Sequence, residues 1–239
     1  MKNLKKLLAL MLALSLVFAL TACGSEPKGS VTSDNNSTST PAPTAEPEKT
    51  PEPEPEYNVE MGSMNGGTYE NDFVGIGCKL DDSWTYYSED EILQLNGLMV
   101  DSIEDEDLAR QLSESDSFYD MLATTDDGSS VNVVLENLGL IYGHTLDASG
   151  YLDIALESLE DQLPLMGINT TTCEKVSFDF CGSKADGIYI VGTVSVEGME
   201  IDMYQRMACV KAGSYMTCIT ACSYFEDITT DILDMFYAL

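Results

Sequence analysis

The stretch "CEKVSFDFCGSKADGIYIVGTVSVEGMEIDMYQRMACVKAGSYMTCITACSYF" spans residues 173–225 and contains four runs in which apolar and polar residues alternate. Alternation with a period of two is typical of β-strands that bury one face. The runs are separated by turn-forming pieces, which are "GSKAD" (182–186), "EG" (197–198) and "AG" (212–213). Short turns between successive alternating strands predict an antiparallel four-strand meander.

The chain upstream and downstream of the meander adds helices and further strands. The long run at 147–163 has apolar residues at helical spacing, and Pro164 is expected to end that helix. Ser88 with Glu91 forms a capping box before another helix. The other expected elements are strands at 71–80, 84–87, 118–125 and 130–138, an acidic helix at 104–112 after a start at Ser102, and an amphipathic C-terminal helix at 227–239.

Strands followed by a long helix, a meander and a final helix form an α+β pattern. In such domains helices pack on an antiparallel sheet, so one face of each helix must be apolar. The expected buried residues of the long helix are Tyr151, Leu152, Ile154, Ala155, Leu159 and Leu163, and those of the last helix are Ile228, Ile232, Leu233, Met235 and Phe236. On the short aromatic strand, Trp84 and Tyr86 are expected to face the core and Tyr87 the other side.

The order of these elements resembles that of the PsbP-like family, named for an accessory protein of photosynthetic oxygen evolution. Its members often open with a strand, a Leu-Pro-x-x-Trp turn and a helix. Here the stretch reads "GIGCKLDDSW" (75–84): Leu80 and Trp84 keep the spacing, and Asp81 stands where proline would be. The resemblance covers most of 70–239 and implies an α/β/α sandwich. Members include accessory, binding and assembly-factor proteins, and no functional residue is carried over from them.

The N-terminus has the three regions of a secretory signal peptide. Lysines at positions 2, 5 and 6 precede the apolar run "LLALMLALSLVFAL" (7–20), which is short for a membrane-spanning helix. The following Thr21-Ala22-Cys23 resembles, with Leu20, the lipobox of bacterial lipoproteins. The resemblance implies cleavage between Ala22 and Cys23, lipid attachment at Cys23, and a location on the cell membrane, facing outside the cytoplasm.

Residues 24–56 are expected to be a disordered tether. They are rich first in Ser and Thr and then in Pro and Glu, and Val31 is their one aliphatic residue larger than alanine. Such a composition buries too little apolar surface to offset chain entropy. An extended tether of this length would reach on the order of 100 Å. The chain thus divides into a signal peptide (1–22), a lipidated cysteine with its tether (23–56) and a single α+β domain (57–239).

The charge balance excludes some partners. The chain has 11 basic and 41 acidic residues, for a formal net charge of −30. Nucleic-acid binding depends on Lys and Arg meeting phosphates, so we expect no nucleic-acid partner. The expected partners are the membrane, through the lipid anchor, and a protein or small molecule that the sequence does not identify.

Few residues of the sequence are candidates for a catalytic or metal-binding role. His144 is the one histidine and is expected in a loop, without a nucleophile motif nearby. The acidic clusters at 88–91, 104–107 and 126–130 lack the spacing of a calcium loop and suit helix starts and turns. We therefore assign no catalytic residue, no metal ligand and no cofactor.

Six cysteines remain when Cys23 is assigned to the anchor. They are Cys78, Cys173, Cys181, Cys209, Cys218 and Cys222. An even number in an exported domain allows disulfides, whereas a domain of this size does not need them. We favour mainly reduced core thiols, with at least four free, and place Cys209, Cys218 and Cys222 on one apolar face with neighbouring methionines. A bridge between Cys173 and Cys181 is the least favoured pairing.

Two classes of function remain. The first is a lipid-anchored extracytoplasmic binding or accessory module without catalysis, and the second is a small cell-surface hydrolase with an acidic site. A deep cleft with converging carboxylates or His144 would favour the hydrolase, and a closed, featureless sheet-and-helix domain would favour the module. A solute-binding lipoprotein of a transporter is disfavoured, because such proteins usually need two lobes and 57–239 suffices for one domain.

Overall fold

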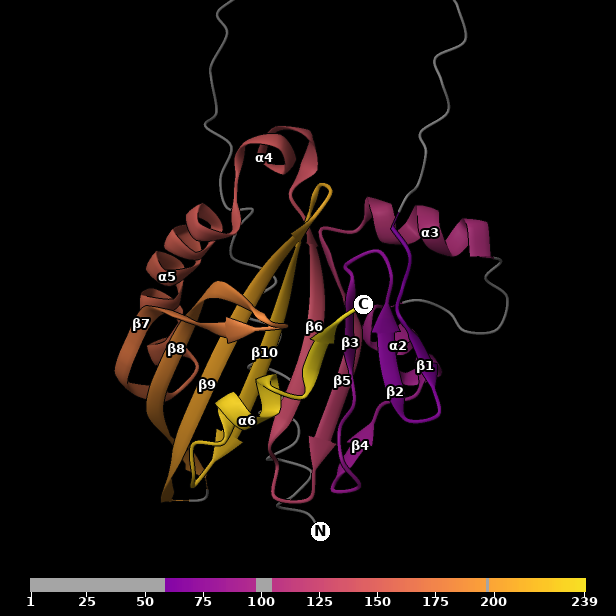
Figure 1. Cartoon of the computed structure of the whole chain (residues 1–239). Helices are drawn as coiled ribbons and strands as arrows, with labels where there is room; N and C mark the ends of the chain where they lie inside the picture. Colours follow the sequence, from indigo (N-terminus) through magenta and orange to yellow (C-terminus); the bar gives the residue numbers. More distant parts are fainter. Residues whose placement is uncertain (1–58, 98–104, 197) are drawn as a thin grey trace, which may run out of the picture.

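The computed structural model describes residues 59–97, 105–196 and 198–239 (Figure 1). It is an α+β structure with two antiparallel sheets. The larger sheet has seven strands in the order β4-β5-β6-β10-β9-β8-β7, and the smaller has four in the order β1-β2-β3-β11. The strands are β1 (Ser63–Asn65), β2 (Thr68–Asn71), β3 (Ile76–Cys78), β4 (Trp84–Tyr86), β5 (Ser117–Thr125), β6 (Ser130–Asn137), β7 (Ile168–Phe180), β8 (Ser183–Val196), β9 (Met199–Ala212), β10 (Tyr215–Tyr224) and β11 (Phe236–Ala238). The helices are α2 (Glu89–Leu95), α3 (Asp105–Glu114), α4 (Gly139–Thr145), α5 (Ala148–Leu165) and α6 (Thr229–Leu233).

The predicted meander is confirmed as β7 to β10, with two turns displaced. Ala212 pairs with Tyr215, so the last turn is Gly213-Ser214 and not Ala212-Gly213. A type II′ turn needs positive φ at its first central residue, which Gly213 supplies with φ 60°. The resulting register differs by two residues from the expected one, so every side chain keeps its face. Likewise β8 begins at Ser183 within the expected "GSKAD" turn.

Two helices cover one face of the seven-stranded sheet. Helix α5 packs on β7, β8 and β9, and α2 packs on β5 (Figure 1). Beneath α5 lies the sulfur-rich face expected from the sequence, formed by Met203, Met207, Cys209, Met216, Cys218 and Cys222. The helix contributes the predicted Tyr151, Leu152, Ala155, Leu159 and Leu163. Ile154 is the exception at 42% exposure, and Pro164 lies within the last turn instead of ending the helix.

The other face is covered by the small sheet together with α6 and apolar residues of α3. The expected C-terminal helix is wrong in its second half: α6 ends at Leu233, and Phe236–Ala238 form β11 against β3. Five residues are too few for a stable helix alone, whereas β3 offers a free edge. The ring of Tyr237 occupies the space that a side chain at position 77 would need. Glycine at this position therefore permits the close pairing of β11 with β3.

The expected strand at 71–80 is also divided in the structure. β2 ends at Asn71 and β3 begins at Ile76, and the amide of Gly75 bonds to the carbonyl of Asn71 across the turn. By contrast, the Ser88–Glu91 capping box, the aromatic strand and the hairpin of β5 and β6 are confirmed. Residues 98–104, including the predicted start at Ser102, lie outside the described residues.

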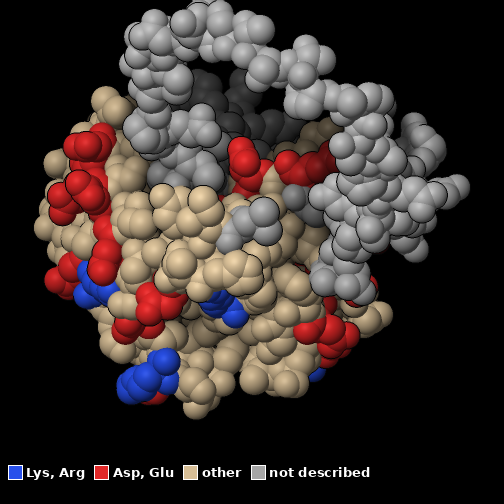
Figure 2. All heavy atoms as spheres, turned by 90° about the horizontal axis from the view of Figure 1, so that it is seen from above, with Lys and Arg blue, Asp and Glu red and all other residues tan. Residues whose placement is uncertain are grey.

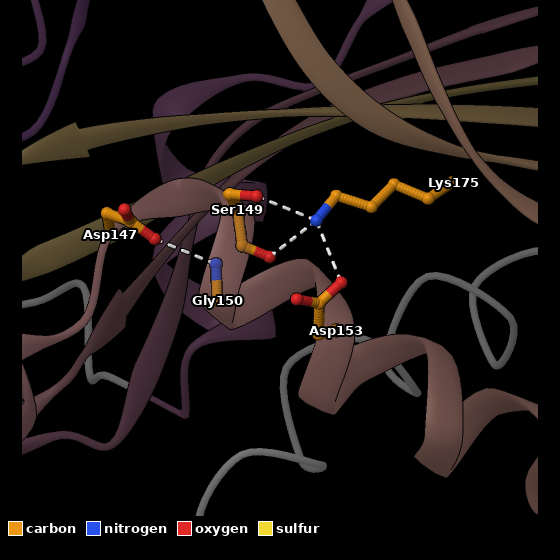
Figure 3. A network of polar contacts seen from close by, with 5 residues as sticks. All are labelled: Asp147, Ser149, Gly150, Asp153 and Lys175. Carbon is orange, nitrogen blue, oxygen red and sulfur yellow. Dashed lines mark hydrogen bonds and ion pairs between the residues drawn. The ribbon is translucent and has the colours of Figure 1, made fainter.

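A lysine fixes the start of α5 on the sheet. Lys175 of β7 extends its Nζ to the carbonyl and hydroxyl oxygens of Ser149 and to Oδ1 of Asp153, at 2.7–2.9 Å (Figure 3). Asp147 caps the same turn by accepting from the amide of Gly150 at 2.8 Å. All three donor positions of the ammonium have an acceptor, so this cluster is a structural anchor.

Candidate functional site

Strand β5 contains a bulge that redirects a carboxylate. Tyr119 pairs with Val134 and Met121 with Val133, so Asp120 has no partner on β6. A bulge residue leaves the alternation of its strand and bends it. As a result Asp120 points toward the small sheet while Phe118 and Met121 keep their places in the core between the two sheets.

Three donors surround the Asp120 carboxylate, which is 5% exposed. Oδ1 accepts from the amide of Gly62 at 2.8 Å, and Oδ2 accepts from Asn71 Nδ2 at 2.7 Å and from the hydroxyl of Tyr69. Burial raises the pKa of Asp120, and these three donors oppose that rise. Burial also raises the pKa of Tyr69 well above its usual value, so the phenol remains a donor. The network joins the β1–β2 hairpin to the large sheet.

The same part of β5 is an open edge, because β4 pairs only with its far half, Ala123–Thr125. The side chain of Asn96, just after α2, substitutes for a neighbouring strand. Its Nδ2 donates to the carbonyl of Tyr119 at 2.8 Å, and its Oδ1 accepts from the amide of Tyr119 at 2.7 Å. Asn96 therefore satisfies both backbone groups of Tyr119, and no described strand covers the edge of β5 next to this residue.

A cleft of about 530 Å³ lies at this edge, where α2, α3 and the first described residues of the chain meet. Its walls combine apolar and acidic side chains. The lining residues are Val59, Glu60, Met61, Gly62, Ser63, Met64, Tyr87, Glu89, Ile92, Leu108, Leu112, Asp120 and Met121. Among these described residues there is no Lys or Arg, so the cleft presents negative charge beside apolar side chains. Seen from above, most of the described surface is uncharged, and acidic side chains cover more of it than basic ones do (Figure 2).

A second buried polar chain runs through the sulfur-rich face. Tyr151 of α5 donates its hydroxyl to Oε2 of Glu136 at 2.5 Å, Cys218 Sγ lies 3.5 Å from that hydroxyl, and Cys209 Sγ lies 3.6 Å from Cys218 Sγ. Glu136 is 3% exposed, and burial raises its pKa to about 7, with Asp116 adding to the rise and Tyr151 opposing it. Neither Glu136 nor Tyr151 lines the cleft.

The sequence-derived candidates are dispersed. His144 is exposed in the last turn of α4, a short helix where a loop was expected, and no described carboxylate or nucleophile is hydrogen-bonded to it. The cluster at 88–91 caps α2, and Asp127 accepts from Thr125 and Ser129 in a turn, as expected. Within 59–97, 105–196 and 198–239, no three His, Cys, Asp or Glu side chains are grouped to hold a metal ion.

The aromatic strand follows the predicted alternation. Trp84 and Tyr86 pack against the core between the sheets, and Tyr87 lies on the other side beside Ile92. Tyr87 also reaches the cleft. Of the predicted aromatic set, Tyr87 is thus the residue that the structure brings to the candidate site.

All six domain cysteines are free thiols in the structure. Cys173 packs on the α5 side of the sheet and Cys181 on the opposite side, so these two do not face each other. Ala22 and Cys23 lie outside the described residues. Of the helices that the structure describes, none is both long enough and apolar enough to cross a membrane.

Asp120 and Glu136 are functional candidates that were not predicted from the sequence. Both stand inside apolar runs, "FYDML" and "VVLEN", where alternation predicts one polar face. An acidic residue among buried neighbours on a central or bulged strand was the available signal, because carboxylates are rarely fully buried without partners.

No protein-family model matches the chain, and no curated protein matches it. Among solved structures, it is similar to LpqN, described as involved in cell envelope biogenesis of Mycobacterium tuberculosis. The identity is 12% and the TM-score 0.37, over 67% of this chain and 76% of that one. A likeness of this strength defines neither a family nor a function.

Proposed function

We propose that the chain is a lipid-anchored extracytoplasmic binding or accessory module whose ligand enters the cleft at the β5 edge. The cleft carries the binding part of this proposal, because its described lining joins apolar side chains to carboxylates without a basic residue. Small-ligand sites commonly combine apolar walls with a few polar groups that fix the ligand. The favoured ligand combines a positive charge with an apolar portion, as in a basic peptide or an alkylamine.

The membrane part of the proposal depends on the N-terminal sequence. The signal peptide, Cys23 and the acidic tether at 24–56 would hold the domain outside the cytoplasm and away from the lipid surface. A PsbP-like ancestry belongs to the same proposal. It is supported by the order of the Trp84 strand, α2, α5 and the meander, whereas the small sheet over the second face is a feature that the resemblance did not imply.

The hydrolase alternative is favoured by one observation, which is that Glu60, Glu89 and Asp120 all line the cleft. Acid–base chemistry needs a carboxyl within reach of the substrate and free to exchange its proton. Both oxygens of Asp120 already accept hydrogen bonds from the protein. This engagement makes the binding module the better-supported function.

The anchor is tested by Cys23→Ser. Without the thiol no thioether to lipid forms, so we expect the protein in the soluble fraction or retained as an uncleaved precursor. Fractionation of the producing cells with mass spectrometry of the N-terminal peptide measures both outcomes. A Cys23→Ser protein that is processed and still membrane-bound would refute the anchor.

The cleft is tested with octylamine and its neutral match, octanol. We expect the full chain to bind the amine more tightly, and Glu60→Gln with Glu89→Gln to weaken amine binding about three- to tenfold while octanol binding stays unchanged. Both carboxylates are exposed, so a larger effect is not expected. Calorimetric titration at low salt measures the affinities.

The matched control is Glu157→Gln with Glu160→Gln, which removes two exposed carboxylates of α5 outside the cleft. Its amine affinity should equal that of the wild type. Equal loss in the control and in the cleft variant would mean that net charge, and not the cleft, attracts the amine. Turnover of glycoside or ester probes that disappears in the cleft variant would favour the hydrolase instead.

A further inference from the structure

Cys209 and Cys218 face each other across β9 and β10. They are register partners in this hairpin, and their sulfur atoms are 3.6 Å apart. Their exposed fractions are 4% and 3%. No other two described cysteines are paired in register on neighbouring strands.

The hairpin places this pair at a position suited to a cross-strand bond. Ala212 and Tyr215 close the two-residue turn, where a β-turn makes its hydrogen bond. Hydrogen-bonded and non-hydrogen-bonded pairs alternate along antiparallel strands. Three steps from the turn, Cys209 and Cys218 are therefore a non-hydrogen-bonded pair. Such pairs have Cα atoms about 4.5 Å apart, within the range that a disulfide spans.

We propose that Cys209 and Cys218 form an intrachain disulfide when the chain meets a disulfide oxidant. One cysteine thiolate attacks a sulfur of the oxidant, forms a mixed disulfide and releases one thiol of the oxidant. The second cysteine then attacks the protein sulfur of the mixed disulfide and releases the other thiol. The two cysteines lose two electrons and two protons, and the oxidant is reduced to two thiols.

The other four thiols are placed differently. Cys222 shares the face under α5, but it lies four residues beyond Cys218 on β10 and pairs with Gln205 and Ser130. Cys78 and Cys181 belong to the core on the opposite side of the sheet. Cys173 pairs with Ile190 on the outer strands. A single disulfide would leave these four free.

Helix α5 controls access to the pair. Tyr151 of α5 has its hydroxyl 3.5 Å from Cys218 Sγ, and both sulfur atoms lie in the core beneath that helix. Burial also raises the pKa of the Cys209 thiol well above its usual value, which lowers the fraction of reactive thiolate. Oxidation is therefore expected during folding, before α5 docks, and to be slow once the domain is folded.

The test maps the thiols of the full chain. The reduced protein is unfolded, refolded in a mixture of oxidised and reduced glutathione, denatured in acid and alkylated with N-ethylmaleimide. We expect alkylation of Cys78, Cys173, Cys181 and Cys222, and a linked peptide pair containing Cys209 and Cys218, lighter by two hydrogen atoms; the peptide with Cys23 is not counted. Alkylation of all six domain cysteines, or a bond between other cysteines in place of this one, overturns the proposal. This assay does not use the lipid anchor, so its outcome is independent of the Cys23→Ser result.

Two variants add a stability measurement. Oxidation of the wild type should raise Tm by about 5–10 °C, because the bond constrains the unfolded chain. Cys218→Ala should lose this redox difference, whereas Cys222→Ala, which removes another buried thiol of the same face, should keep it. An equal redox difference in Cys218→Ala contradicts the assignment. If Cys218→Ala does not fold, the wild-type map decides.

Discussion

Asp120→Ala is expected to lower the free energy of unfolding by about 3–5 kcal/mol. The change leaves the hydroxyl of Tyr69, the amide group of Asn71 and the amide of Gly62 without their shared acceptor. Each buried donor without a partner costs about 1–3 kcal/mol. The loss is partly offset, because the variant no longer buries a carboxylate. Urea unfolding followed by circular dichroism measures the difference.

The conservative control is Asp120→Asn, which keeps the shape and one acceptor oxygen. It should lose roughly half as much stability as the alanine variant, because one acceptor oxygen is replaced by an NH2 group that meets the donors of the network instead of accepting from them. Hydrogen exchange separates a local effect from a global one. We expect faster exchange in β1 and β2 than in β9 and β10, because Asp120 joins the hairpin to the large sheet. An alanine variant as stable as the wild type would show that the network contributes nothing.

The larger elements of the fold follow from local patterns in the sequence. The meander, the β5–β6 hairpin and α5 were predictable because period-two and helical spacing are properties of consecutive residues. Even the displaced Gly213-Ser214 turn kept its faces, since a shift by two residues preserves alternation. The sulfur-rich face under α5 was predictable for the same reason.

The second sheet and the cleft depend on contacts between distant parts of the chain. β11 forms because the edge of β3 is free to pair with it. The local sequence of α6, which precedes β11, does not indicate that such an edge lies nearby. Asp120 reaches Gly62 and Tyr69 only because of the bulge at Tyr119/Met121. A one-residue bulge has no period of its own, so the sequence alone did not indicate the site.

Burial of Glu136 is expected to make the free energy of unfolding depend strongly on pH. In the fold, burial raises its pKa from 4.5 to about 7, with Tyr151 donating to its Oε2. A carboxyl whose pKa is raised by folding binds its proton more tightly in the folded state than in the unfolded chain. Its contribution to stability is therefore fully present below pH 4.5 and declines as the pH rises toward 7. The decline amounts to about 3 kcal/mol.

Glu136→Gln should remove this decline, because a neutral amide does not titrate and its oxygen still accepts from Tyr151. The other acids of this acidic chain titrate in both proteins, so the informative quantity is the difference in unfolding free energy between variant and wild type. That difference should rise in favour of the variant by about 3 kcal/mol between pH 4.5 and 8. The control is Glu174→Gln, which removes the same charge from an exposed position on β7. A pH-dependent difference for Glu136→Gln no larger than that of the control would place the Glu136 pKa at its ordinary value and show that the Tyr151 hydrogen bond offsets the cost of burial.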